Sequence, residues 1–160
     1  MYVCPSNVNF INTMIIMKKI IYLVLLSLIT GLVAQAYEKT GEWNGCDRYD
    51  FTFKDRQATI VVPKKAAKGN PWIWRPAFFD AFPSVDKALL EKGFHIVYYD
   101  VTHLYGSPRA VSLGTEFYEN MTDLYNLSEK VTLEGFSRGG LFVFNWAAQN
   151  TEKVACIYVD

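Results

Sequence analysis

The sequence predicts an α/β fold: a mostly parallel sheet with crossover helices and an N-terminal antiparallel hairpin, truncated at the C-terminus. The last third of the chain alternates strand, helix, strand, helix and strand segments, which is the pattern of a parallel sheet with crossover helices. Ahead of it, two short strand-like segments meet at Lys54-Asp55, as in a hairpin. With 160 residues, 51% of them hydrophobic and 20% charged, the chain has a globular composition and the length of one domain.

Residues 1–36 are interpreted as an upstream extension followed by a signal peptide that starts at Met17. Lys18 and Lys19 supply the positive start, residues 20–33 are apolar, and Ala34-Gln35-Ala36 fits the small-residue rule of signal peptidase. The apolar run is short for a membrane span, and a retained N-terminal anchor is the alternative. We therefore expect cleavage before Tyr37, export to the periplasm or the extracellular space, and no stable membrane span afterwards. Residues 1–16 are interpreted as a start-codon artefact.

Residues 37–160 are predicted to form the folded part. The helix that begins at Pro83-Ser84 is expected to use Ser84 as its N-cap and to stop at Gly93. The 94–100 strand is apolar on both faces, as a central parallel strand should be. The last helix is apolar nearly all round and is therefore expected to be buried. The last strand is an apolar run and is expected to be buried as well. In order, the expected elements are a hairpin of 49–53 and 57–62, a strand at 71–79, a helix ending at Lys92, a strand at 94–100, a helix at 109–127, a strand at 130–136, a helix at 139–149 and a strand at 154–159.

Composition excludes several classes of function. The formal net charge is zero, so the chain offers no electrostatic footprint for nucleic acid. The 16% aromatic content indicates a ring-rich core or, alternatively, exposed rings that stack on sugars. Cys46 and Cys156 are expected to be separate thiols, because Cys156 lies in an apolar run where a free Cys acts as a small hydrophobe. Neither metal nor cofactor is expected, since the sequence has no ligand-spaced His or Cys pair and no Gly-rich loop after the first strand.

The segment Gly135-Phe136-Ser137-Arg138-Gly139 carries the chemistry. A Gly-x-Ser-x-Gly pattern between a strand and a helix puts the serine on a tight, strained turn, where flanking side chains would collide. The turn lifts Ser137 above the sheet edge and places it at a helix N-terminus, which favours developing negative charge. Ser137 is therefore the candidate nucleophile.

These segments together resemble the α/β-hydrolase superfamily. GFSRGG after VTLE, followed by a buried helix and VACIYVD, looks like the nucleophile elbow of that superfamily, and WIWRPAFF with ALLEKGFHIVYYDV resembles a group of secreted bacterial esterase-like members. The resemblance covers residues 45–160 and implies the N-terminal portion of the catalytic domain. It also implies that the backbone N–H of Arg138 is one oxyanion-hole donor and that the second comes from Arg75 or Ala77, because Pro76 has no N–H. The Arg75 side chain would hold an acidic substrate group or, more commonly, bridge to a carboxylate.

A serine nucleophile needs a base and an orienting acid, and the superfamily order is Ser, then acid, then His. His95 and His103 both precede Ser137. His95 is expected in the core, whereas His103 follows a strand on the active-site side and is a candidate pocket residue. Asp160, at the end of the last predicted strand, is the candidate acid. We expect the catalytic His, and further strands and helices, to lie beyond these 160 residues.

Two further acidic residues are interpreted as structural. Asp100 ends the strand before the loop of His103 and is expected to be structural or pocket-lining. Glu134 precedes the elbow and is expected to pair with Arg138.

The resulting expectation is an exported serine hydrolase, carboxylesterase-like, that acts on acylated carbohydrate or a small ester through an acyl-enzyme at Ser137. The 160-residue chain alone is expected to be inactive. Two alternatives remain open: a serine peptidase of the same fold, because peptidases also form an acyl-enzyme, and a non-catalytic carbohydrate-binding or scaffold protein.

Overall fold

A computed structural model of the chain describes residues 17–19 and 38–160. Met17–Lys19 is helical, and the rest of the expected signal segment lies outside the described residues. Residues 1–36 and 37–160 form two separate units. Among the described residues, no helix combines the length and the apolar character needed to cross a membrane.

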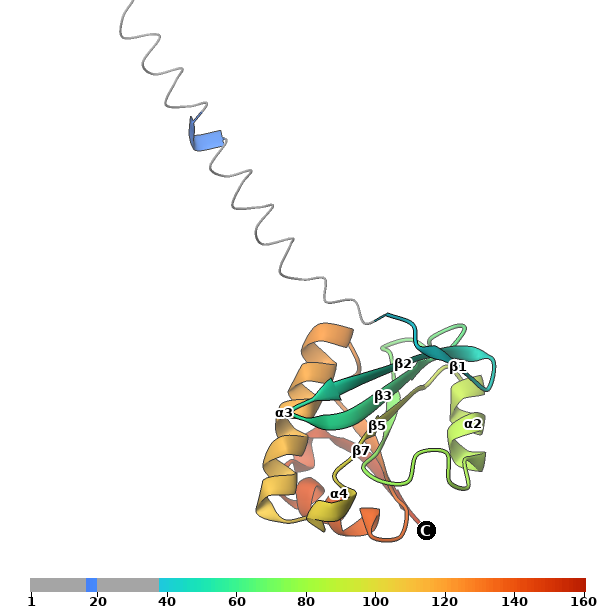
Figure 1. Cartoon of the computed structure of the whole chain (residues 1–160), viewed down its shortest axis with the longest axis vertical. Helices are drawn as coiled ribbons and strands as arrows, with labels where there is room; N and C mark the ends of the chain where they lie inside the picture. The colour runs from blue at the N-terminus through green and yellow to red at the C-terminus, as the bar shows by residue number, and fades with distance from the viewer. Residues whose placement is uncertain (1–16, 20–37) are drawn as a thin grey trace, which may run out of the picture. The chain divides into compact units, whose positions relative to one another are not determined.

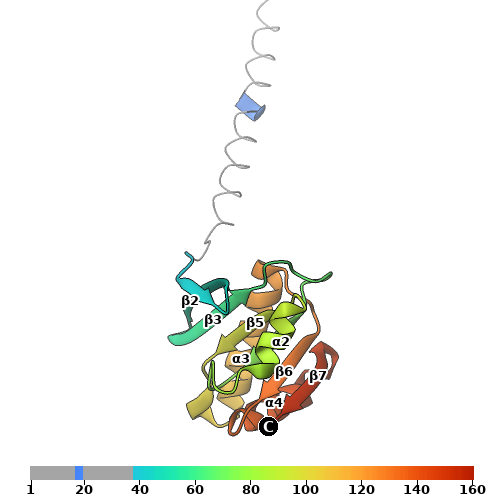
Figure 2. The same ribbon diagram turned by 90° about the vertical axis from the view of Figure 1, so that its right-hand side faces the viewer.

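One seven-stranded sheet forms the centre of the folded unit (Figures 1 and 2). Its order is β1-β2-β3-β5-β4-β6-β7, with antiparallel pairing from β1 through β3 to β5 and parallel pairing between β5, β4, β6 and β7. This confirms the predicted hairpin followed by a parallel sheet. The strands are β1 (Gly41–Trp43), β2 (Cys46–Phe53), β3 (Arg56–Val62), β4 (Trp72–Arg75), β5 (His95–Tyr99), β6 (Val131–Gly135) and β7 (Val154–Val159).

Helices cover both faces of the sheet. Helix α2 (Ser84–Glu91) lies on one face, and helices α3 (Pro108–Tyr125) and α4 (Gly139–Gln149) lie on the other (Figure 2). The core under α2 is small and includes Ile73, Leu90 and Ile96. The core under α3 and α4 is larger and rich in rings, with Trp74 packed edge-on against Trp146 at 5.2 Å between ring centroids. Many of the rings among the described residues therefore stabilise the interior, which favours the ring-rich core among the two interpretations of the aromatic content.

Turn chemistry accounts for the hairpins. Lys54 and Asp55 both adopt positive φ (49° and 61°), which suits the tight two-residue turn between β2 and β3. The short strand β1 was not predicted, although Asn44-Gly45 marks its turn: both residues have positive φ (49° and 73°). An Asn-Gly pair is one of the strongest local signals for such a hairpin.

The last helix and strand are less buried than predicted. α4 buries one face, with Phe142, Val143 and Trp146 inside, but leaves Leu141 50% and Phe144 55% exposed. β7 is an edge strand of the described sheet and is half-buried to exposed along its length. An apolar sequence predicts burial only where a neighbouring element covers it, and here no described element covers the outer side of either.

Smaller differences concern helix caps and thiols. Pro83, not Ser84, occupies the N-cap of α2, and no side chain caps that helix. Cys46 is buried and Cys156 exposed, and both are free thiols. The expectation of separate thiols is confirmed, whereas the buried position expected for Cys156 is wrong.

Candidate active site

Ser137 lies on the turn between β6 and α4. Its φ of 51° is in the left-handed region, which a non-glycine residue adopts at a cost and in which residues of functional turns are found more often than elsewhere. Two backbone hydrogen bonds close the turn: Gly139 N–H donates to Phe136 O at 2.9 Å, and Gly140 N–H to Ser137 O at 3.0 Å. Ser137 itself is exposed, so the strained turn presents its hydroxyl to solvent.

The two glycines of the motif differ in how much room surrounds them. A Cβ on Gly135 would lie 2.6 Å from Val143 Cγ2 and 2.9 Å from the Gly140 backbone, distances that real Cβ atoms do not show. A Cβ on Gly139 would lie 3.3 Å from Ala77 Cβ, which is tight but not prohibitive. The steric requirement inferred from the motif is therefore strong at Gly135 and weaker at Gly139.

The loop after β4 lies next to the elbow, because Ala77 Cβ and Pro76 Cγ are the atoms that a Cβ on Gly139 would approach. Neither Ala77 N–H nor Arg138 N–H has a hydrogen-bond acceptor among the described residues. Arg75, by contrast, is the last residue of β4 and pairs with Tyr98 of β5. Of the two candidates for the second donor, Ala77 is the one that contacts the elbow.

The Arg75 side chain is buried in an acidic cluster below the elbow. Its Nη1 donates to Asp86 Oδ2, and its Nη2 donates to Ala81 O at 2.8 Å and lies 3.4 Å from Glu134 Oε1. Arg75 thus bridges to carboxylates, the commoner of the two roles expected for it. The expected pairing of Glu134 with Arg138 is wrong, because Glu134 lies on the β6 side of the turn and faces Arg75.

Two buried carboxyl groups therefore share one guanidinium. Arg75, Asp86 and Glu134 are at most 4% exposed. Burial, and after it the neighbouring Asp86, raise the pKa of Glu134 to about 8, whereas Arg75 opposes the rise. A pKa of about 8 favours the protonated form of Glu134 at neutral pH, so the cluster is expected to hold one proton there.

The loop of residues 76–83 forms a ring-lined wall next to Ser137. Phe78, Asp80 and Phe82 all have positive φ (54°, 66° and 50°). Two side-chain hydrogen bonds hold the loop: Arg75 donates to Ala81 O, and Trp43 Nε1 donates to Asp80 Oδ1 at 2.9 Å. The rings of Phe78 and Phe82 lie 5.7 and 5.4 Å from that of Phe136, the residue before Ser137.

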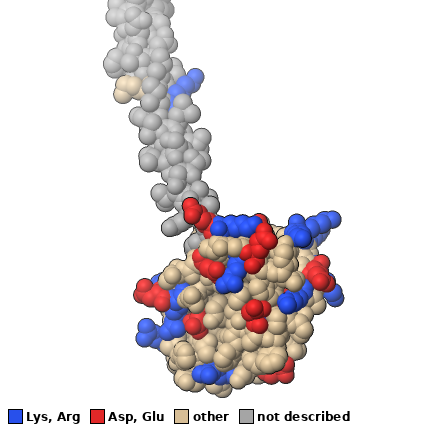
Figure 3. All heavy atoms as spheres, turned by 45° about the vertical axis from the view of Figure 1, so that its right-hand side comes forward, with Lys and Arg blue, Asp and Glu red and all other residues tan. Residues whose placement is uncertain are grey.

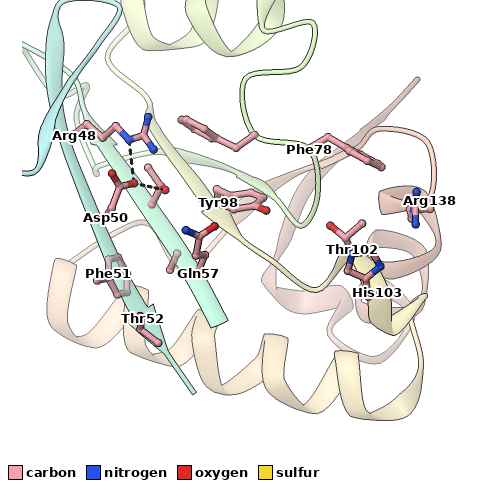
Figure 4. Close-up of a pocket in the computed structure, with 13 residues that line it drawn as sticks. Arg48, Asp50, Phe51, Thr52, Gln57, Phe78, Tyr98, Thr102, His103 and Arg138 are labelled. Atoms are coloured by element: carbon pink, nitrogen blue, oxygen red, sulfur yellow. Dashed lines mark hydrogen bonds and ion pairs between the residues drawn. The ribbon is translucent and has the colours of Figure 1, made fainter. Parts of the chain in front are cut away.

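A pocket of about 590 Å³ lies between this wall, the hairpin and the elbow (Figure 4). Arg138 and His103 lie at one end of the pocket, and the Arg48–Asp50 ion pair at the other, with Tyr98 between them. His103 is exposed in a 3-10 turn (Thr102–Leu104), so the prediction that it lines a pocket on this side is confirmed. Neither α2 nor α3 contributes to the lining of this pocket.

The remaining predicted residues lie as follows. His95 is only 8% exposed, and burial lowers its pKa, which confirms the core position expected for it. Asp100 is structural, since its Oδ1 accepts from Thr102 N–H at 3.0 Å. The backbone of Asp160 contacts the elbow, because its carbonyl oxygen accepts a hydrogen bond from Ser137 N–H at 2.9 Å. No hydrogen bond joins the Ser137 hydroxyl to a histidine among the described residues.

On the side of the folded unit drawn in Figure 3, acidic and basic side chains lie next to one another. Among residues 17–19 and 38–160, no group of three or more His, Cys, Asp or Glu side chains could hold a metal ion.

Comparison with known proteins identifies the fold. No family model and no curated protein matches the sequence. Solved structures do match. A zinc-bound cold-adapted esterase from an Arctic intertidal metagenomic library has a TM-score of 0.54 and 9% identity, and the match covers 74% of this chain and 63% of the esterase. An epoxide hydrolase from Vigna radiata has a TM-score of 0.51, 12% identity and coverage of 71% and 39%, and Cfl2 from Burkholderia cenocepacia has a TM-score of 0.50, 16% identity and coverage of 71% and 40%, in the same order. The chain therefore has the α/β-hydrolase fold, and it spans between about two fifths and less than two thirds of the length of these proteins.

Proposed function

We propose that this chain carries the nucleophile half of a serine hydrolase that cleaves carboxylic esters, with acylated carbohydrate or a small ester as substrate. The observation that supports the proposal best is the strained, exposed Ser137 on the turn between β6 and α4. A non-glycine residue held at φ 51° costs free energy that a purely structural turn could avoid with glycine. The α/β-hydrolase fold of the chain is consistent with hydrolysis.

The proposed reaction uses Ser137 as the nucleophile and two backbone amides, one from the elbow and one from the loop after β4, as oxyanion donors. Ser137 Oγ attacks the ester carbonyl carbon and forms the acyl–oxygen bond, its proton passes to a histidine base that follows in the superfamily's chain order, and the alcohol leaves with that proton. Water then cleaves the acyl-enzyme, releases the acid and restores the hydroxyl. The amides of Arg138, in the elbow, and Ala77, in the adjacent loop, are the proposed donors to the oxyanion, because neither has an acceptor among the described residues. Asp160 remains the proposed acid.

Covalent labelling tests the nucleophile. In the complete gene product, a fluorophosphonate probe should label Ser137, and Ser137→Ala should abolish both labelling and ester turnover. Ser112→Ala, an exposed serine on α3, is the matched control and should change neither. If Ser137→Ala retains wild-type turnover, the assignment fails. A wild type that neither labels nor turns over any ester or peptide would favour the binding-protein alternative, and turnover of peptides alone would favour the peptidase.

A further inference from the structure

We propose that the pocket beside the elbow recognises a carboxylate group on the substrate through the Arg138 side chain, so that the preferred esters are anionic. This inference rests on the proposed function, since it specifies the substrate class of the same site. The two observations behind it are the charge balance of the pocket and the way in which Arg138 is held.

The pocket contains one cation that no anion neutralises. Arg48 Nε lies 2.9 Å from Asp50 Oδ1, so these two charges cancel. Although partial burial opposes it, hydrogen bonds led by those from Thr59 and Arg48 hold the pKa of Asp50 below its ordinary value, and Asp50 stays ionised. Arg138 has no ion pair and no side-chain hydrogen bond among the described residues.

Aromatic rings hold the guanidinium of Arg138 in place. Its central carbon lies 5.3 Å from the centre of the Phe78 ring and 5.9 Å from that of Tyr105. Such contacts use the face of the guanidinium and leave the N–H donors at its edge available for a planar, two-oxygen partner. A carboxylate fits that fork with two parallel hydrogen bonds.

The N–H donors of Arg138 lie where they could bind a substrate group near the scissile bond. Arg138 directly follows Ser137, and its guanidinium lines the pocket together with Phe78 and His103 (Figure 4). An ester whose carbonyl lies at Ser137 would extend into this end of the pocket, its carboxylate at Arg138 and a ring or chain against Phe78 and Tyr98. Acidic sugars and half-esters of dicarboxylic acids have this chemistry.

The first experiment measures binding and does not need catalysis. Phenylacetate and its uncharged analogue phenylacetamide, which have almost the same shape, are titrated into the complete protein by calorimetry at low and moderate salt. Phenylacetate should bind more tightly, its affinity should fall with salt, and Arg138→Gln should remove about tenfold of its advantage, as for a charge-assisted hydrogen bond lost at a partly exposed site. Arg109→Gln, an exposed cation on α3, should keep the advantage.

The second experiment measures specificity. The ratio of kcat/KM for 4-nitrophenyl hemisuccinate over 4-nitrophenyl valerate should exceed one in the wild type and fall about tenfold in Arg138→Gln but not in Arg109→Gln. If phenylacetate has no advantage, or if Arg138→Gln leaves it intact, the anion site is refuted even when esters are hydrolysed. If no ester is hydrolysed but phenylacetate binds through Arg138, the anion site stands and the proposed hydrolase activity fails.

Discussion

Replacing Glu134 with glutamine is expected to remove a pH dependence from the stability of the folded chain. Burial next to Asp86 raises the pKa of Glu134 to about 8 in the folded state, against an ordinary value of 4.5. Between those two values the unfolded chain has released this proton while the folded chain keeps it. Folding is therefore favoured by acid, and its stability must fall as the pH rises through this window.

The size of the effect follows from proton linkage. One proton bound only by the folded state changes the free energy of unfolding by about 1.4 kcal/mol per pH unit. From about pH 5.5 to about pH 7.5, with partial release near the upper end, the wild type should lose about 2.5 kcal/mol through Glu134. With a urea m-value of roughly 1–3 kcal/mol/M, the unfolding midpoint should fall by about 0.8–2.5 M.

The assay is urea unfolding of the full chain, followed by tryptophan fluorescence at several pH values. His95 acts in the opposite direction, because burial lowers its pKa and its contribution is lost as the pH falls below its ordinary value of 6.5. The difference between wild type and Glu134→Gln cancels this term. Glu91→Gln, an exposed carboxyl on α2 with no ion pair among the described residues, is the control and should run parallel to wild type.

Glu134→Gln keeps the shape of the side chain and can still donate to Asp86 and accept from Arg75, so the variant should fold. Its stability should vary less with pH than that of wild type. If the two profiles run parallel from about pH 5.5 to 7.5, Glu134 is ionised in the folded state, and the one-proton description of the cluster is wrong.

Two further predictions concern export and the isolated domain. N-terminal sequencing of protein from the native compartment should begin at Tyr37, and intact residues 1–36 on cytosolic protein would contradict the signal peptide. Residues 37–160 alone should hydrolyse 4-nitrophenyl acetate no faster than about 10³–10⁴-fold over water, which is the rate enhancement that remains when a triad lacks one member. Robust turnover that His103→Ala abolishes would show that His103 is the base.

The order of strands and helices was predictable, because hydrophobic period and turn residues are local properties of the chain. Gly93, with a φ of 87°, follows the C-cap of α2 and ends the helix, and Lys54-Asp55 marks the hairpin turn. The strained turn at Ser137 was predictable for the same reason: Gly135 and Ser137 are two residues apart, and the motif itself states the steric requirement of the turn. Elements whose residues lie close in sequence were therefore found, with β1 as the exception.

The surroundings of the site were less predictable, since they depend on contacts between distant segments. Arg75, Asp86 and Glu134 come from β4, α2 and β6, and only the sheet order, with β4 next to β6, brings them together. Charge alone suggested the wrong partner for Glu134, because Arg138 is closer in sequence than Arg75. The exposure of β7 has the same origin: burial is decided by neighbouring elements, and strand composition carries no information about them.

The two glycines of the elbow allow a direct test of how much of the motif is steric. Gly135→Ala places a Cβ within 3 Å of both Val143 and the Gly140 backbone, so strand β6 and helix α4 must separate, at a cost of about 1–3 kcal/mol by analogy with overpacked cores. In Gly139→Ala the new Cβ meets Ala77 Cβ at 3.3 Å and Pro76 Cγ at 3.5 Å, an ordinary contact distance. The entropy that the substitution removes from the unfolded chain offsets the tighter contact, so the stability of this variant should stay within about 1 kcal/mol of wild type. Gly139→Val should lose more of both stability and activity, because a branched side chain would push the loop that carries Ala77 away from the elbow. Urea unfolding of the three variants gives the order, and equal costs for Gly135→Ala and Gly139→Ala would mean that the turn tolerates side chains differently from what its packing predicts.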